Sequence, residues 1–237
     1  MKHWIQIVVI IGLTMSACTT SDQTGVTVSV LEDVTEDYFI ARPNASAIHS
    51  KFSLDDDAWQ SATFRYGAIS SLVHNKRMEE RLEGGEALLG NQLERDAKIE
   101  QFYAQIDSLL QEPRERSEHQ YSSIWNPLVE ELAHLQRDSS SQTTLYLFSD
   151  LQENNSEWFS VHRYKDLVQL DTCPDKVEAL FLQQASVLRK GSLHIKVVVV
   201  YQPKTIEEDK AFAKMRKLYT HVFAELAIPI AFVSHLN

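Results

Sequence analysis

The sequence contains few of the residues that mark several common classes of protein. Two of its 237 residues are cysteine, too few for a disulfide-stabilised scaffold, and seven are glycine, which leaves little material for a phosphate-binding loop. Acidic side chains outnumber basic ones by 33 to 23, and the net charge of −10 argues against nonspecific binding to nucleic acid. The histidines form no H-x-x-x-H or H-E-x-x-H pattern, and neither G-x-S-x-G nor G-x-G-x-x-G occurs. These gaps argue against a zinc hydrolase, a nucleophile-elbow hydrolase and a dinucleotide-binding enzyme.

What the sequence does contain is typical of a folded α/β protein. Its residues are 43% hydrophobic and 24% charged, which excludes wholesale disorder and a multi-span membrane protein. The length suits one α/β domain or two small ones. No internal repeat or long linker divides the chain, and we therefore expect one folded domain.

The first residues indicate export from the cytoplasm. Lys2 and His3 precede an apolar run over residues 4–15, which is the pattern of a secretory signal peptide. The run is shorter than the roughly 20 apolar residues that a transmembrane helix needs. The run ends in Met15-Ser16-Ala17-Cys18, which resembles a bacterial lipobox. That resemblance implies that residues 1–17 are removed, that Cys18 is lipidated, and that residues 18–25 form a tether to a domain over residues 26–237. A plain signal peptide or a retained signal anchor are the alternatives.

A lipidated Cys18 would fix the protein to a bacterial cell envelope by acyl chains alone. Thr19 follows it and supplies no aspartate-type signal for retention at the inner membrane, which favours the outer membrane and leaves the face open. Cys173 would then be a lone thiol, and we expect it to be buried.

Apolar runs and amphipathic stretches alternate along the rest of the chain. The β-branched and apolar runs predict buried strands over residues 26–31, 63–70, 143–148, 193–201 and 228–234, with a short edge strand over 78–83. Apolar side chains at helical spacing predict helices around residues 99–110, 124–135, 177–188 and 212–226. Thr205 and Glu208 have the spacing of a capping box at the start of the last helix. This order predicts a three-layer, Rossmann-like α/β fold with a mostly parallel sheet and helices on both faces.

Acidic residues follow two of the predicted strands. The first strand leads into a segment that contains Asp33, Thr35 and Asp37, and the third leads into Ser149-Asp150. Ligands of open α/β sheets bind outside the carboxyl ends of the strands, so Asp33 and Asp150 would share an edge if their strands are parallel neighbours. Carboxylates with hydroxyl groups between them are the ligands of a hard divalent cation such as Mg²⁺.

At these residues the sequence resembles the von Willebrand factor A family. The family has D-x-S-x-S after its first strand, and this chain has Asp33-x-Thr35-x-Asp37; the family's T-D-G after the fourth strand corresponds to Ser149-Asp150-Leu151. The segment Tyr121-Ser122-Ser123-Ile124-Trp125-Asn126-Pro127-Leu128 is similar to the family's G-T-x-I-x-x-A-L helix opening. The resemblance implies a metal-ion-dependent adhesion site, with Asp33, Thr35, Asp37, Ser122 and Asp150 around Mg²⁺, or alternatively Mn²⁺ or Ca²⁺.

Two departures bear on that site. Asp37 replaces a serine, so three carboxylates around one divalent ion would leave a local charge of −1, which disfavours an incoming carboxylate from a partner. Leu151 replaces the glycine that follows the last aspartate. The fold implied by the resemblance is less affected by these changes than the adhesion site is.

The sequence therefore predicts a lipid-anchored binding or assembly module with a protein partner in the envelope, and no catalytic residues. Two alternatives remain open: a metal-free scaffold of an envelope complex, and a Mg²⁺-dependent hydrolase. Asp33 and Asp150 could equally act as helix caps, and Ser122 or Ser123 as the N-cap of the helix that follows.

Overall fold

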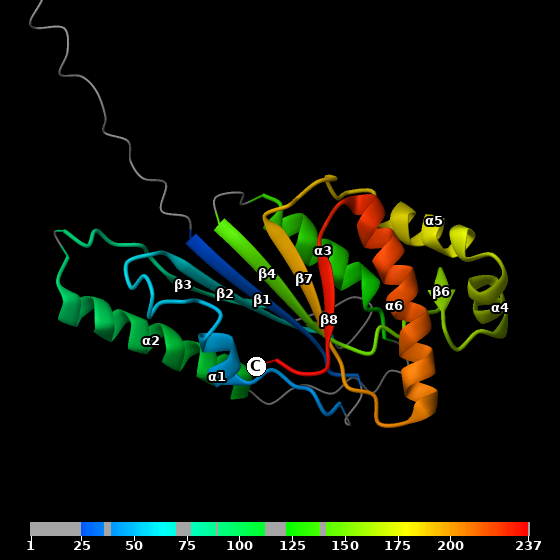
Figure 1. Cartoon of the computed structure of the whole chain (residues 1–237), viewed down its shortest axis with the longest axis horizontal. Helices are drawn as coiled ribbons and strands as arrows, with labels where there is room; N and C mark the ends of the chain where they lie inside the picture. The colour runs from blue at the N-terminus through cyan, green and yellow to red at the C-terminus, as the bar shows by residue number, and fades with distance from the viewer. Residues whose placement is uncertain are drawn as a thin grey trace, which may run out of the picture.

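The computed structural model describes residues 25–35, 39–69, 77–88, 90–111, 122–137 and 141–236. A six-stranded sheet in the order β3-β2-β1-β4-β7-β8 runs through the middle of the molecule (Figure 1). Five strands are parallel, and β3 alone is antiparallel to its neighbour β2. The strands are β1 (Gly25–Asp33), β2 (Ala62–Ile69), β3 (Arg77–Leu82), β4 (Ser141–Phe148), β7 (Ile195–Val200) and β8 (Ile230–Val233).

Helices cover both faces of this sheet, so the predicted three-layer, Rossmann-like α/β architecture is confirmed (Figure 1). One face carries α1 and α2, and the other carries α3, α5 and α6, with α4 beside α5. A two-stranded hairpin, β5 with β6, follows the end of β4. These elements are α1 (Ala45–His49), α2 (Gln92–Gln111), α3 (Trp125–Leu135), α4 (Tyr164–Thr172), α5 (Pro174–Gln184), α6 (Ile206–Leu226), β5 (Asn154–Asn155) and β6 (Phe159–Ser160).

The strand sequences are apolar on both sides because each face of the sheet has its own core. Along β1, Val28 and Val30 belong to the core under α1 and α2, whereas Leu31 belongs to the core under α3, α5 and α6. Trp125, at the start of α3, is fully buried in the second core and packs its ring against Phe181 of α5 at 5.1 Å. Side chains alternate between the faces of a strand, so a strand covered on both faces reads as a continuous apolar run.

The predicted elements match the observed ones closely. All five predicted strands are present, and the short strand expected near residues 78–83 is β3, the antiparallel edge. The Thr205 hydroxyl accepts a hydrogen bond from the Glu208 backbone N–H (3.1 Å), as expected for the cap of α6. The prediction that Cys173 is buried is wrong: it lies at the junction of α4 and α5 and is exposed.

A buried ion-pair network joins α3 to three adjacent strands. Glu131 of α3 accepts hydrogen bonds from Arg65 of β2 (2.6 Å), Arg77 of β3 (3.1 Å) and the hydroxyl of Ser29 of β1 (2.9 Å). Burial alone would raise the pKa of Glu131, but Arg65 and Arg77, together with Ser29, hold that pKa below its ordinary value. Glu79 of β3 pairs with the same Arg65. The carboxylate in this network is therefore neutralised by cations.

Among the helices of the described residues, none combines the length and the apolar character that a membrane span requires. The predicted signal peptide (residues 1–17), Cys18 and most of the predicted tether lie outside those residues.

Candidate functional site

At the carboxyl end of β1, the side chain of Asp33 accepts hydrogen bonds from hydroxyl groups in three separate parts of the chain. Its Oδ1 accepts hydrogen bonds from the Thr35 hydroxyl (2.6 Å) and backbone N–H (3.1 Å). Its Oδ2 accepts from the hydroxyls of Ser149, just after β4 (3.2 Å), and Ser122, just before α3 (3.4 Å). Asp33 is 3% exposed. One buried carboxylate thus connects the ends of two neighbouring strands to the start of a helix.

Asp150 lies at the same edge, because β1 and β4 are parallel neighbours. Its residue is 5% exposed, and its two carboxylate oxygens accept hydrogen bonds from the backbone and the side chain of Gln152, at 2.8 Å each. The adjacent Ser149 hydroxyl also accepts from the backbone N–H of Leu151 (3.0 Å). The turn after β4 is therefore organised by Asp150 and Ser149 together.

A third carboxylate, Glu153, is fully buried at the same edge. It accepts hydrogen bonds from the Ser123 hydroxyl (3.0 Å) and from the backbone N–H groups of Ile124 and Trp125 (2.8 Å each), at the start of α3. Burial raises the pKa of Glu153 to about 7; the hydrogen bonds from Trp125, Ile124 and Ser123 oppose the rise, and the charge of Asp33 adds to it. This carboxylate is held by a helix N-terminus rather than by a cation.

Tyr219 of α6 approaches these carboxylates from the helical layer. Its side chain is fully buried, and its hydroxyl has no hydrogen-bond partner among the residues that the structure describes. Burial and then the charges of Glu153, Asp150 and Asp33 raise the pKa of Tyr219 well above its ordinary value. Three acidic side chains therefore act on one buried hydroxyl at the carboxyl edge.

Leu151 adopts a backbone conformation that favours glycine. Its φ is +65°, in the left-handed region, where a bulky side chain is strained. The side chain is fully buried in the core under α3, α5 and α6, which compensates for the strain. The turn after β4 thus keeps a glycine-like backbone although the residue is leucine.

Of the five residues predicted as metal ligands, the structure brings Asp33, Thr35 and Ser122 into direct contact and places Asp150 at the same edge. Asp37 lies outside the described residues. The donors are carboxylate and hydroxyl oxygens, which suit Mg²⁺ better than a softer metal. Within the described ranges, no group of three or more His, Cys, Asp or Glu side chains is placed to hold a metal ion. A cation at this edge would thus depend on hydroxyl groups for several of its ligands.

The site includes three residues that the sequence did not single out. Ser149 stands beside Asp150 in the F-S-D segment, so its hydroxyl was visible in the sequence, although its contact with Asp33 was not. Glu153 and Tyr219 carried no local signal. Their roles depend on contacts with residues 28 or more positions away in the chain.

No protein-family model matches the chain, and no curated protein matches it either. Among solved structures, the crystal structure of the human COPII-coat protein Sec24c matches 90% of this chain and 30% of its own length, at 10% sequence identity and a TM-score of 0.35. A similarity this low does not indicate a function.

Proposed function

We propose that the protein is a lipid-anchored binding module of the bacterial cell envelope, with a von Willebrand factor A-like fold, and that the carboxyl edge of its sheet docks a protein partner. The observation that carries this proposal is the set of buried carboxylates at that edge, Asp33, Asp150 and Glu153. Glu131, the buried carboxylate of the α3 network, is paired with arginines, whereas Glu153 is held by neutral groups. Buried carboxylates at the ligand-binding edge of an α/β sheet, one of which (Glu153) has a raised pKa, are typical of a functional site.

The turn after β4 supports the family resemblance. The family has glycine at the position of Leu151, and the backbone there has the positive φ that glycine adopts most readily. The backbone at Leu151 would therefore suit the glycine that the family has at this position.

The position at which strand β1 begins supports the proposed orientation of the domain relative to the membrane. Gly25 begins β1 at the amino edge of the sheet, and Asp33 ends it at the carboxyl edge (Figure 1). If Cys18 is lipidated, the residues between it and Gly25 can span at most about 25 Å. The anchor would hold the amino edge near the bilayer and leave the carboxyl edge facing away from it, where a partner can reach it.

A divalent cation fits the chemistry of this edge. Asp33, Thr35, Ser122 and Asp150 would hold it, with Asp37 nearby, and Mg²⁺ would supply a positive charge that accepts an oxygen ligand from the partner. A metal-free scaffold is the second candidate. It is favoured by the hydroxyl and amide donors that already surround Asp33 and Asp150.

Magnesium titration separates these two candidates. The full chain, stripped with a chelator and kept in detergent, is titrated with MgCl₂ while its melting temperature is followed. At 100 times the dissociation constant, binding adds about 2.7 kcal/mol, which corresponds to roughly 5–10 °C for a chain of this length. Metal binding predicts that Asp33→Asn and Asp150→Asn abolish the shift and that Asp55→Asn, in an exposed turn, retains it. No shift in the unmodified protein supports the metal-free scaffold.

A second experiment tests the docking edge itself. Ile40 follows β1 on the carboxyl side and is 54% exposed, and the preceding Phe39 packs against Tyr201 at the end of β7. A photo-crosslinking amino acid at position 40 should capture one discrete envelope protein in living cells. The same amino acid at Val187, 68% exposed after α5, is the control. Equal capture from both positions would contradict docking at the carboxyl edge. In a separate activity assay, turnover of a phosphate ester would favour the hydrolase alternative.

A further inference from the structure

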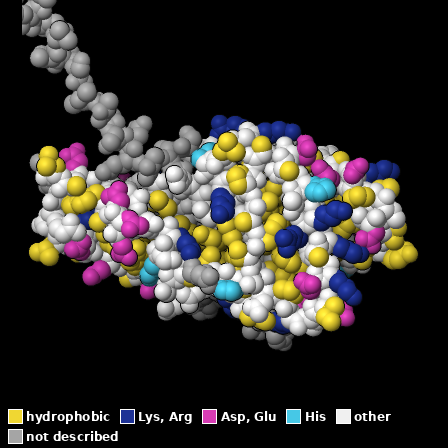
Figure 2. Space-filling model, viewed as in Figure 1, with side chains coloured by type: hydrophobic (Ala, Val, Ile, Leu, Met, Phe, Trp, Pro, Cys, Tyr) yellow, Lys and Arg dark blue, Asp and Glu magenta, His cyan; other side chains and the backbone are white. Residues whose placement is uncertain are grey.

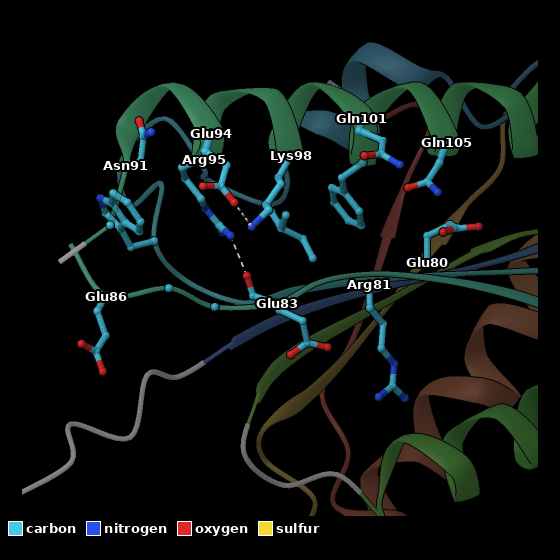
Figure 3. Close-up of a pocket in the computed structure, with 16 residues that line it drawn as sticks. Glu80, Arg81, Glu83, Glu86, Asn91, Glu94, Arg95, Lys98, Gln101 and Gln105 are labelled. Atoms are coloured by element: carbon cyan, nitrogen blue, oxygen red, sulfur yellow. Dashed lines mark hydrogen bonds and ion pairs between the residues drawn. The ribbon is translucent and has the colours of Figure 1, made fainter. Parts of the chain in front are cut away.

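A groove lies between strand β3 and helix α2, at the far side of the sheet from β8. It encloses about 580 Å³, within the range of peptide and ligand sites. Figure 3 shows that α2 forms its roof and that β3 with the following segment forms its base. Its lining includes Trp59, Glu80, Leu82, Gln101, Phe102 and Gln105.

The base of the groove is the edge of the sheet. β3 pairs with β2 on one side, and the described strands place no neighbour on its other side. An edge strand presents backbone N–H and C=O groups to any extended chain that lies beside it. Helix α2 packs over the face of β3 at this edge.

The interior of the groove is apolar at its deepest point and polar along its roof. Leu82 and Phe102 are buried there, and the half-buried ring of Trp59 closes one end. At Gly90 an added Cβ would lie 2.1 Å from that ring, so only glycine leaves room for it. Gln101 and Gln105 line the roof opposite the strand (Figure 3). Such a surface accepts alternating apolar and polar side chains.

The charges that line the groove leave an excess of carboxylate. Lys98 is paired with Glu94 (2.8 Å), and Arg95 donates hydrogen bonds to three backbone carbonyls, including that of Glu83 (2.6 Å). Among the described residues, the carboxylates of Glu80 and Glu83 have no cationic partner. Glu80 points toward α2 and Glu83 points to the opposite side of the strand (Figure 3). The side of the strand that faces α2 therefore has an uncompensated negative charge at Glu80. On the other side (Figure 3) Glu83 is accompanied by Arg81, which pairs with Glu79 (2.5 Å).

The surface around the groove is also negatively charged. Residues 77–111 contain eight acidic and four basic side chains. Figure 2 shows acidic side chains gathered over the α2 end of this face and lysine and arginine side chains over the α6 end. A basic occupant would be attracted to the α2 end before any specific contact forms.

We propose that this groove binds an extended basic segment of a protein partner, which adds to β3 as a seventh strand. Backbone hydrogen bonds to β3 supply affinity. One basic side chain faces Glu80 under α2, a second faces Glu83 on the other side, and an apolar side chain lies over Leu82 and Phe102. The groove opens at the amino edge of the sheet, because Leu82 of β3 is paired with Ala62 at the start of β2. It is therefore separate from the carboxyl-edge site.

Three synthetic peptides test the proposal. The first is a fluorescent ten-residue peptide of valine and threonine with two lysines three positions apart, a spacing that places them on opposite sides of a strand. The second has glutamate for each lysine, and the third keeps the lysines but has two central prolines, which cannot donate to a strand ladder. Binding to the full chain in detergent is measured by fluorescence anisotropy. We expect the lysine peptide to bind at least ten times more tightly than either of the others.

Variants of the protein locate the binding. Glu80→Gln with Glu83→Gln should weaken the lysine peptide at least five-fold, and Gln105→Trp, which fills the groove from the roof, should weaken it at least ten-fold. Glu157→Gln, an exposed acid in the β5–β6 turn, should leave it unchanged. Amide hydrogen exchange of residues 77–82 should slow when the lysine peptide is bound.

Several results would overturn the proposal. Equal binding of the proline peptide would mean attraction by charge alone, and unchanged exchange in residues 77–82 would mean that no strand is added. A dimer of the chain that the Glu80 and Gln105 variants dissociate would assign the edge to a second copy instead of a peptide.

Discussion

Replacing Glu153 by glutamine should remove most of the pH dependence of stability near neutrality. The carboxyl of Glu153 has a pKa of about 7 in the folded protein against 4.5 for the ordinary group. The folded state therefore keeps this proton over a range in which the unfolded chain has lost it. Under those conditions the free energy of unfolding falls as the pH rises from 4.5 to 7 and is constant above 7.

The size of the effect follows from the same two values. Each unit of pKa difference corresponds to about 1.4 kcal/mol, so the span from 4.5 to about 7 corresponds to roughly 3 kcal/mol. Glutamine resembles the protonated acid: its carbonyl can accept from the N–H groups of Ile124 and Trp125, and its amide can donate to Ser123. We therefore expect Glu153→Gln to match the unmodified protein near pH 4.5 and to exceed its stability by roughly 3 kcal/mol at pH 8.

Urea unfolding at a series of pH values between 4.5 and 8 measures this difference. The unmodified protein should show the slope and Glu153→Gln should lack it, while Glu157→Gln, an exposed acid in the same segment, should retain it. The reasoning is refuted if Glu153→Gln is destabilised equally at every pH, because Glu153 would then be ionised and required as an anion throughout.

Two further substitutions test the energetics of buried positions. Glu131→Gln should lower the free energy of unfolding by about 3–5 kcal/mol at pH 7, since it leaves buried arginines without their partner; Glu130→Gln, 69% exposed on the same helix, should change it by about 0.5 kcal/mol or less. Leu151→Ala should lower the free energy of unfolding in urea by about 2–5 kcal/mol, because it creates a cavity and keeps the positive φ. Leu88→Ala is the control, since Leu88 is 94% exposed, and it should leave the free energy of unfolding unchanged. Equal effects at positions 151 and 88 would contradict the burial of Leu151.

Most of the fold could be predicted because its signals are local. Val28 and Val30 lie in a run that is apolar on both sides, and such a run specifies a strand buried on both faces wherever it occurs. Thr205 caps α6 through a residue three positions away. The short helices α1 and α4 and the β5–β6 hairpin were not predicted, because helices of five and nine residues and strands of two residues show too little periodicity.

The site was predicted only in part for the same physical reason. Asp33 and Asp150 follow strands, and the parallel pairing of β1 with β4 brings them to one edge. Glu153 is different, because what defines it is a contact with the start of α3, and no local pattern reports which helix a distant carboxylate will cap. Tyr219 reads in the sequence as one more apolar position of an amphipathic helix, and only the structure brings its hydroxyl near the acids.

Three unfavourable features lie at the turn after β4 and in its surroundings, although positive φ angles also occur at Ser53 and Ala227. A leucine there has a positive φ, a buried carboxylate there lacks a cation, and a buried hydroxyl nearby lacks a partner among the described residues. The α3 network on the same side of the sheet shows that this chain can neutralise a buried acid when arginines are placed against it. No arginine is among the described contacts of Glu153, and burial there raises the pKa of its carboxyl instead. Sequences that break local rules at one place and obey them elsewhere do so most often at functional sites. We therefore expect substitutions at the carboxyl edge to weaken binding of a partner without a matching loss of stability.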